Sequence, residues 1–154
     1  MNTDEIYELV LNFRHAIDCA VENRDFNGII CFDRFPRRCC GMASDILGHY
    51  LIEHGIESNY VCGTYRDGGF ENNQSHAWVE LYDGTIIDIT GDQFKYDDVF
   101  LRYDVPVYVG PMDAFHEMFE VEECDIRPSV RLEDMSGMVE PLFRAMAAIN
   151  KYLK

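Results

Sequence analysis

Apolar positions that recur every three or four residues predict three helices along the chain. In residues 3–21 the apolar side chains repeat with the period of one helix face, and Thr3 precedes them as the expected N-cap. A second pattern of this kind covers residues 40–53 and stops before Gly55. Glycine at such a position commonly ends a helix because it adopts the left-handed conformation. A third helical pattern covers residues 138–154.

The segments between these helices alternate or cluster in ways that are typical of short strands. Four of them are expected to be strands: 58–65, 76–82, 85–90 and 105–110. Residues 29–35 are expected to form a short strand or an extended segment, residues 66–75 a glycine- and asparagine-rich loop, and residues 122–137 an exposed connection. Because no repeat, linker or low-complexity tract divides the chain, the pattern predicts one α+β domain over residues 1–154.

The register of the hairpin between the second and third expected strands decides which side chains share a face. A two-residue loop at 83–84 would place His76 and Asp88 on opposite faces, because side chains alternate along a strand. A three-residue loop at 82–84, with Gly84 in the left-handed position, places them on one face. It also gathers a continuous apolar set on the other face: Ala77, Val79, Leu81, Ile87 and Ile89. We therefore predict the three-residue turn and a hydrogen bond from His76 to Asp88.

Composition narrows the classes of partner. The 154 residues carry a formal net charge of −15, from 28 acidic and 13 basic side chains. A field of this sign repels phosphate backbones and anionic lipid surfaces, so neither nucleic acid nor a membrane is expected as a partner. No stretch approaches the length of apolar chain that crosses a bilayer, and no signal peptide opens the sequence, so we expect a cytoplasmic protein.

The six cysteines show neither a C-x-x-C pair nor a zinc-finger spacing. We therefore expect reduced thiols and no structural metal. In the middle of the chain, however, a cysteine begins a helix, a histidine opens a strand, and an aspartate lies on the next strand. A helix N-terminus favours a thiolate, a neutral imidazole accepts the thiol proton, and a carboxylate orients the imidazole. Arg34, Arg37 and Arg38 concentrate positive charge just before this helix.

The stretch "RCCGMASDILGHYLIEHGIESNYVCG…SHAWVELYDGTIIDIT", within residues 35–94, resembles the transglutaminase-like branch of the papain-like cysteine enzymes. That branch has a nucleophile at a helix start about fifteen residues before a Gly-Ile, then a His-Ala-Trp-hydrophobic-Glu strand, then Asp-x-Thr. The resemblance implies a papain-like core, with the cysteine helix packed on a small antiparallel sheet. It also implies acyl transfer at an amide or ester without a cofactor, on a peptide or protein substrate, with water or an amine as acceptor.

Carried over by position, the resemblance assigns a triad of Cys40, His76 and Asp88. Helical periodicity does not distinguish Cys40 from its neighbour Cys39, but Cys40 precedes Gly55 by fifteen residues, which is the spacing of the family. Cys39 is then a packing residue or a thiol that traps an oxidised neighbour. The products of this chemistry can be those of a peptidase, a glutamine deamidase or a transglutaminase.

A second hypothesis is a peptide- or protein-binding module that keeps the fold without turnover. It is favoured by Arg38, which stands where the family usually has glycine. A redox or metal-binding role is a third. Asp92 and Gln93 follow the third strand and either line a cleft or form an ordinary polar loop. The remaining histidines have no comparable context and are interpreted as surface or structural residues: His15, His49, His54 and His116.

Overall fold

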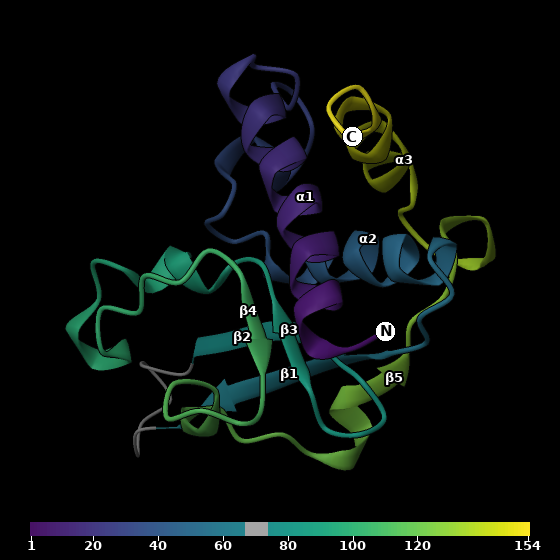
Figure 1. Ribbon diagram of the computed structural model, residues 1–154. Coiled ribbons are helices and arrows are strands. Elements are labelled where there is room, and N and C mark those ends of the chain that lie inside the picture. The colour runs from purple at the N-terminus through teal and green to yellow at the C-terminus, as the bar shows by residue number, and fades with distance from the viewer. Residues whose placement is uncertain (67–73) are drawn as a thin grey trace.

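Three helices and a five-stranded antiparallel sheet form the α+β fold of the computed structural model, which describes residues 1–66 and 74–154 (Figure 1). The helices are α1 (Thr3–Glu22), α2 (Cys40–Glu53) and α3 (Glu140–Asn150). The strands are β1 (Asn59–Tyr65), β2 (Gln74–Glu80), β3 (Ile86–Asp88), β4 (Tyr108–Gly110) and β5 (Ile126–Pro128). In space the strands run in the order β4-β3-β2-β1-β5.

Each face of the sheet is covered by its own apolar cluster. The helices cover one face: α2 contacts β1 and β2, α1 contacts β4, and α3 packs on α1 and α2 (Figure 1). The opposite face carries an aromatic cluster supplied by the sheet and by residues 94–119. Its buried members are Val61, Trp78, Ile86, Phe94, Phe100, Phe115 and Phe119. The sheet is therefore covered on both faces, and β3 is buried along its whole length.

The helices begin and end close to the expected residues. The cap of α1 is Asn2 and not Thr3: the Asn2 side chain accepts from the backbone N–H of Glu5, whose carboxylate accepts from the backbone N–H of Asn2. This reciprocal capping box satisfies two amide donors at once, which a cap at Thr3 would not do. Helix α2 spans the predicted residues 40–53, and Gly55 follows it with a φ of +76°.

The hairpin between β2 and β3 has the predicted three-residue turn. Val79 pairs with Ile87, and the backbone N–H of Leu81 donates to the carbonyl of Thr85 at 2.8 Å. Gly84 closes the turn with a φ of +92°, a conformation that other residues rarely adopt. The predicted register is confirmed, and it is the register that places His76 and Asp88 on one face.

Three expectations for the remaining segments need correction. Residues 29–35 form no strand; a single 3₁₀ turn, Phe32–Arg34, lies there. The supposed connection 122–137 contains β5, which pairs with β1 and adds an edge strand to the sheet. The predicted loop 66–75 lies mostly outside the described residues, and its last two positions already belong to β2.

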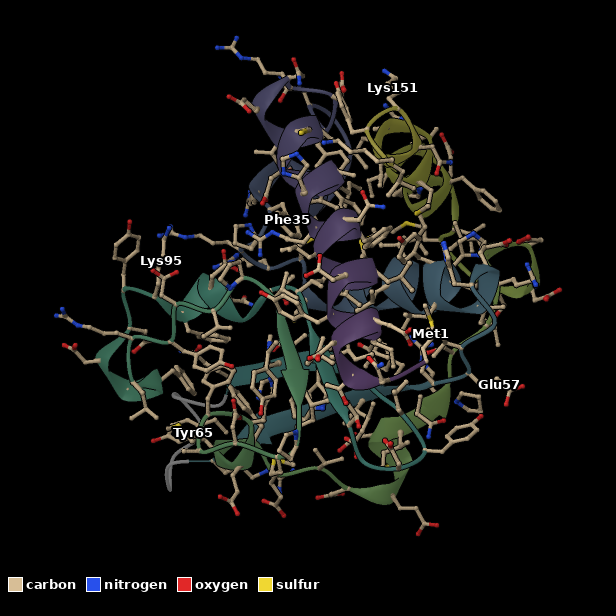
Figure 2. The ribbon with its side chains drawn as sticks, in the orientation of Figure 1. Met1, Phe35, Glu57, Tyr65, Lys95 and Lys151 are labelled. Atoms are coloured by element: carbon tan, nitrogen blue, oxygen red, sulfur yellow. The ribbon has the colours of Figure 1, made fainter. Side chains whose placement is uncertain are left out.

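A buried arginine ties α1 to the turn that follows β3. The guanidinium of Arg14 donates to both carboxylate oxygens of Asp92, at 2.9 and 2.7 Å, and to the carbonyl oxygen of Ile89 at 2.8 Å. It also lies over the ring of Phe35, which Figure 2 shows beside α1. The turn between β3 and residue 93 is thus held in place by a helix from the start of the chain.

Among the described ranges, none of the helices combines the length and the apolar character that crossing a bilayer requires.

Candidate active site

Cys40 is the first residue of α2, and its half-buried thiol lies against His76 and Ala77 of β2. The backbone enters this helix through Arg38, whose φ is +54°. Burial raises the pKa of the Cys40 thiol, but hydrogen bonding to His76, the charge of that ring and the backbone N–H of Ala77 outweigh it. The net pKa is lower than the ordinary value for cysteine, so the thiolate is favoured here.

His76 lies near the start of β2 with no exposed surface. Its Nε2 is 2.7 Å from Oδ2 of Asp88, at the end of β3. With Nε2 engaged, Nδ1 is the ring nitrogen left to face the Cys40 thiol, and the side-chain amide of Gln93 also contacts it. Four aromatic rings surround the imidazole, with centroids 5.1 to 5.7 Å away: Trp78, Phe94, Phe115 and Phe119. Packing therefore fixes the plane of the ring, and the hairpin register fixes its carboxylate partner.

The pKa values of His76 and Asp88 are shifted in opposite directions. Burial lowers the pKa of His76, but the adjacent Asp88 carboxylate and the Cys40 thiol raise it to about 9. Burial raises the pKa of Asp88, but His76 and His116 hold it well below its usual range. A charged imidazole beside an ionised carboxylate is the result, which favours a thiolate at Cys40 in turn.

The neighbouring thiol behaves differently. Cys39 is 1% exposed and belongs to the apolar core between the helices. Burial, followed by the proximity of Cys31 and Cys40, raises the pKa of the Cys39 thiol far above its ordinary value. The structure thus brings Cys40 together with His76 and Asp88 and turns Cys39 away into the core.

An open pocket of about 500 Å³ adjoins this cluster. Gln93 connects the two, because its Nε2 lies 3.2 Å from Nδ1 of His76 and its side chain lines the pocket. Arg37 and Arg38 line the same pocket, and neither forms an ion pair with any of the residues that the structure describes. The sequence left the roles of Asp92 and Gln93 undecided between lining a cleft and forming a polar loop. In the structure Gln93 faces the cluster, whereas Asp92 binds Arg14.

His116 is the residue that sequence reasoning missed. Of the two interpretations, surface or structural, the structure excludes the first: the ring is fully buried, and its Nε2 lies 2.7 Å from Oδ2 of Asp88, the same oxygen that contacts His76. The segment before β5 folds back over the sheet and brings the ring there. A signal was present: Asp113 precedes His116 by three residues and contacts its Nδ1 at 2.6 Å.

A metal ion is the other chemistry that two imidazoles and a carboxylate suggest. The ligand atoms of His76, Asp88 and His116 all lie within 4.8 Å of one another. Atoms bound to one tetrahedral zinc ion lie roughly 3.3 Å apart, given metal bonds of about 2.0–2.1 Å. The two nitrogens instead lie 2.7 Å from the shared oxygen, which is the separation of a hydrogen bond. The three residues fit shared protons better than an ion.

No family model matches the chain, and no curated protein or solved structure shows significant similarity to it. What the site can do is therefore argued from its own geometry.

Proposed function

We propose that the protein is a cysteine-dependent acyl-transfer enzyme of the transglutaminase-like, papain-like type, acting on an amide bond of a peptide or protein. One observation carries the proposal: a thiol with a lowered pKa at a helix start, next to an imidazole that an ionised carboxylate holds on its other nitrogen. These are the parts that nucleophilic catalysis by cysteine needs. The location of Cys40 on a helix packed against an antiparallel sheet supports the papain-like core.

In the proposed reaction the Cys40 thiolate attacks the carbonyl carbon of the substrate amide, and the carbonyl π electrons move to oxygen. The backbone N–H of Cys40, unpaired at the first turn of α2, donates to this oxyanion. His76 gives its Nδ1 proton to the nitrogen of the leaving amine as the carbon–nitrogen bond breaks. A thioester on Cys40 remains, and water or an amine attacks its carbonyl carbon while giving a proton to His76. The carbon–sulfur bond then breaks, which releases the carboxylic acid or the new amide and restores the thiolate and the imidazolium.

The side-chain amide of Gln93 is the second oxyanion donor in this proposal. It reaches the nitrogen that faces the thiol, so a carbonyl oxygen bound next to Cys40 lies within its range. Removal of one such donor costs roughly 10²- to 10³-fold in rate. The pocket beside Gln93 receives the substrate. Its charged lining consists of Arg37, Arg38, Asp97 and Asp98, and Asp98 is paired with Arg102, so the two guanidinium groups favour a substrate that carries a carboxylate.

The same contact supports the competing hypothesis of a binding module without turnover. The Gln93 amide occupies Nδ1 of His76, which a productive imidazole must offer to the thiol. The variant Gln93→Ala separates the two. If Gln93 is an oxyanion donor, acylation slows while thiol alkylation is unchanged. If Gln93 blocks the imidazole, its removal accelerates alkylation and the wild-type protein forms no acyl-enzyme.

The direct test uses p-nitrophenyl acetate as an activated acyl donor. The expected result is a burst of p-nitrophenol and one acetyl group on Cys40, located by peptide mass spectrometry. Cys39→Ala is the matched control and should retain the burst, whereas Cys40→Ala should lose it. The absence of an acetyl group on Cys40 in the wild-type protein would overturn the proposed function.

A further inference from the structure

Asp88 has two imidazole partners, although a triad needs one. Its Oδ2 lies 2.7 Å from Nε2 of His76 and 2.7 Å from Nε2 of His116. Its Oδ1 accepts from the backbone N–H of Thr90 at 2.9 Å. All available sides of the carboxylate are therefore used by donors, and both imidazole partners have no exposed surface. An ionised carboxylate, which only accepts, is the form that this arrangement requires.

The second nitrogen of His116 also meets a carboxylate. Its Nδ1 lies 2.6 Å from Oδ1 of Asp113. Asp113 is itself held by two donors, the backbone N–H of His116 at 2.8 Å and the hydroxyl of Tyr103 at 3.0 Å. A neutral imidazole carries a single N–H and can donate to only one of two ionised carboxylates. Each ring nitrogen of His116 thus faces a carboxylate oxygen, one from Asp88 and one from Asp113, and an N–H on both nitrogens would satisfy both contacts.

We propose that His116 is a positioning residue of the reaction: a buried imidazolium, held by a carboxylate on each ring nitrogen, that offsets the charge of Asp88 and thereby favours the thiolate of Cys40. This rests on the proposed function, since it concerns the same thiol. The titratable groups that face the His116 ring come from β2, β3, β4 and residues 103–113, and they are His76, Asp88, Tyr108, Tyr103 and Asp113.

His116 favours the thiolate because charges of opposite sign alternate along the chain of contacts. With the thiolate formed and His116 protonated, these charges are negative on Cys40, positive on His76, negative on Asp88, positive on His116 and negative on Asp113. Asp88 taken alone raises the pKa of the Cys40 thiol, because a buried negative charge disfavours a second one nearby. The imidazolium of His116 neutralises that effect while leaving Asp88 able to hold His76. Without it, the same chain of contacts would carry one more uncompensated negative charge in a dry environment.

Two variants test the role of the charge. His116→Gln keeps an N–H donor for Asp88 and removes the charge, whereas Asp113→Asn removes the carboxylate that requires the second proton. The rate of alkylation by iodoacetamide is measured against pH for each variant and for His54→Gln, an exposed control. In both site variants the rise in thiol reactivity should move about one pH unit toward the alkaline side. It should not move in His54→Gln.

Thermal unfolding of the same proteins distinguishes a positioning role of His116 from a purely structural role. A structural role alone would lower the melting temperature of His116→Gln and leave the pH profile of the surviving folded protein in place; that outcome overturns the inference. If His116→Gln does not fold, Asp113→Asn decides, since its side chain is 22% exposed and an amide fits the same space.

A spectroscopic readout addresses the protonation state itself. Long-range ¹H–¹⁵N correlation spectra of the wild-type protein, recorded at the pH of the alkylation assay, should show both ring nitrogens of His116 protonated. A neutral tautomer under these conditions overturns the inference even if Cys40 is reactive. An inert Cys40 with a protonated His116 instead overturns the proposed function, and the positioning role with it.

Discussion

Arg14 of α1 and Asp92 of the turn after β3 form a two-point ion pair in the interior, although 78 residues separate them in the chain. Both side chains are at least nine-tenths buried. Removing one partner of a buried pair costs about 3–5 kcal/mol when the other charge is left uncompensated. Arg14 keeps a second, half-exposed carboxylate partner in Asp18, so we expect Asp92→Asn to lower the free energy of unfolding by about 3 kcal/mol, the lower end of that range. Urea denaturation measures it.

The matched control for this prediction is Asp98→Asn. Asp98 also pairs with an arginine, Arg102, but both side chains are exposed. Exposed pairs contribute about 0–1 kcal/mol. Equal losses in the two variants would contradict the view that the buried pair ties α1 to the site.

The two adjacent cysteines should differ in reactivity. Cys40 is accessible and its thiol has a lowered pKa, whereas Cys39 is buried with a raised one. Near neutral pH, Cys40→Ala should therefore abolish rapid labelling by an electrophilic probe, and Cys39→Ala should retain most of it. Intact-mass spectrometry of the two variants decides the matter, and the reverse pattern would show that the assignment is off by one residue.

His76 should set the pH range of the thiol. Its replacement in His76→Gln removes the ring that lowers the pKa of Cys40, so the rise in alkylation rate should move toward the alkaline side by at least about one pH unit. In the wild-type protein, acyl transfer should decline as the pH passes about 9, where His76 loses the proton that the leaving amine needs. A profile that is identical in both proteins would break the proposed pair.

Because of Asp88, the free energy of unfolding should depend on pH in the acidic range. Its pKa is lower in the folded protein than in the unfolded chain, so the unfolded chain takes up the proton first as the pH falls below the ordinary value of 3.8. The stability that Asp88 supplies is therefore complete above that pH and is lost as the pH falls further. Asp88→Asn should be less stable than the wild type near neutral pH, and the difference should shrink in acid. Urea unfolding at a series of pH values measures both, and a constant difference would contradict the assignment.

The arginines of the pocket should influence the choice of acyl donor. Mono-p-nitrophenyl succinate and p-nitrophenyl butyrate have acyl chains of the same length, but only the first ends in a carboxylate. The double variant Arg37→Glu, Arg38→Glu should lower the preference for the succinate by about threefold to tenfold, as expected for exposed charges. Arg24→Glu, a substitution outside the pocket at another exposed residue with positive φ, should leave it unchanged. Equal preferences in all three proteins would remove the carboxylate from the proposed substrate.

The parts of the fold that depend on local pattern were accessible from the sequence. One apolar face through Val79 and Ile87 is compatible with one register only, and that register places His76 against Asp88. The start of α2 at Cys40 follows from the same kind of local evidence. These predictions needed no knowledge of distant contacts.

The missed parts depend on contacts between distant segments. Strand β5 is exposed along its whole length and exists because β1 offers it an edge, so its own residues show no alternation. His116 lies in a single 3₁₀ turn, and its role depends on how that turn docks over β3. The Asp-x-x-His spacing was visible, but the second carboxylate lies 28 residues upstream. No local rule connects the two.

The aromatic enclosure of His76 has a bearing on the order of events in an acyl-transfer reaction. Among the described residues the ring has no exposed surface, and its free side faces Cys40 and Gln93. In the proposed reaction a departing amine and an incoming acceptor would therefore both meet the imidazole from that side, and the first product would leave before the acceptor enters. Substituted-enzyme kinetics, with a persisting acyl-cysteine, would follow. The acceptor most abundant at that moment, water or an amine, would then determine the product.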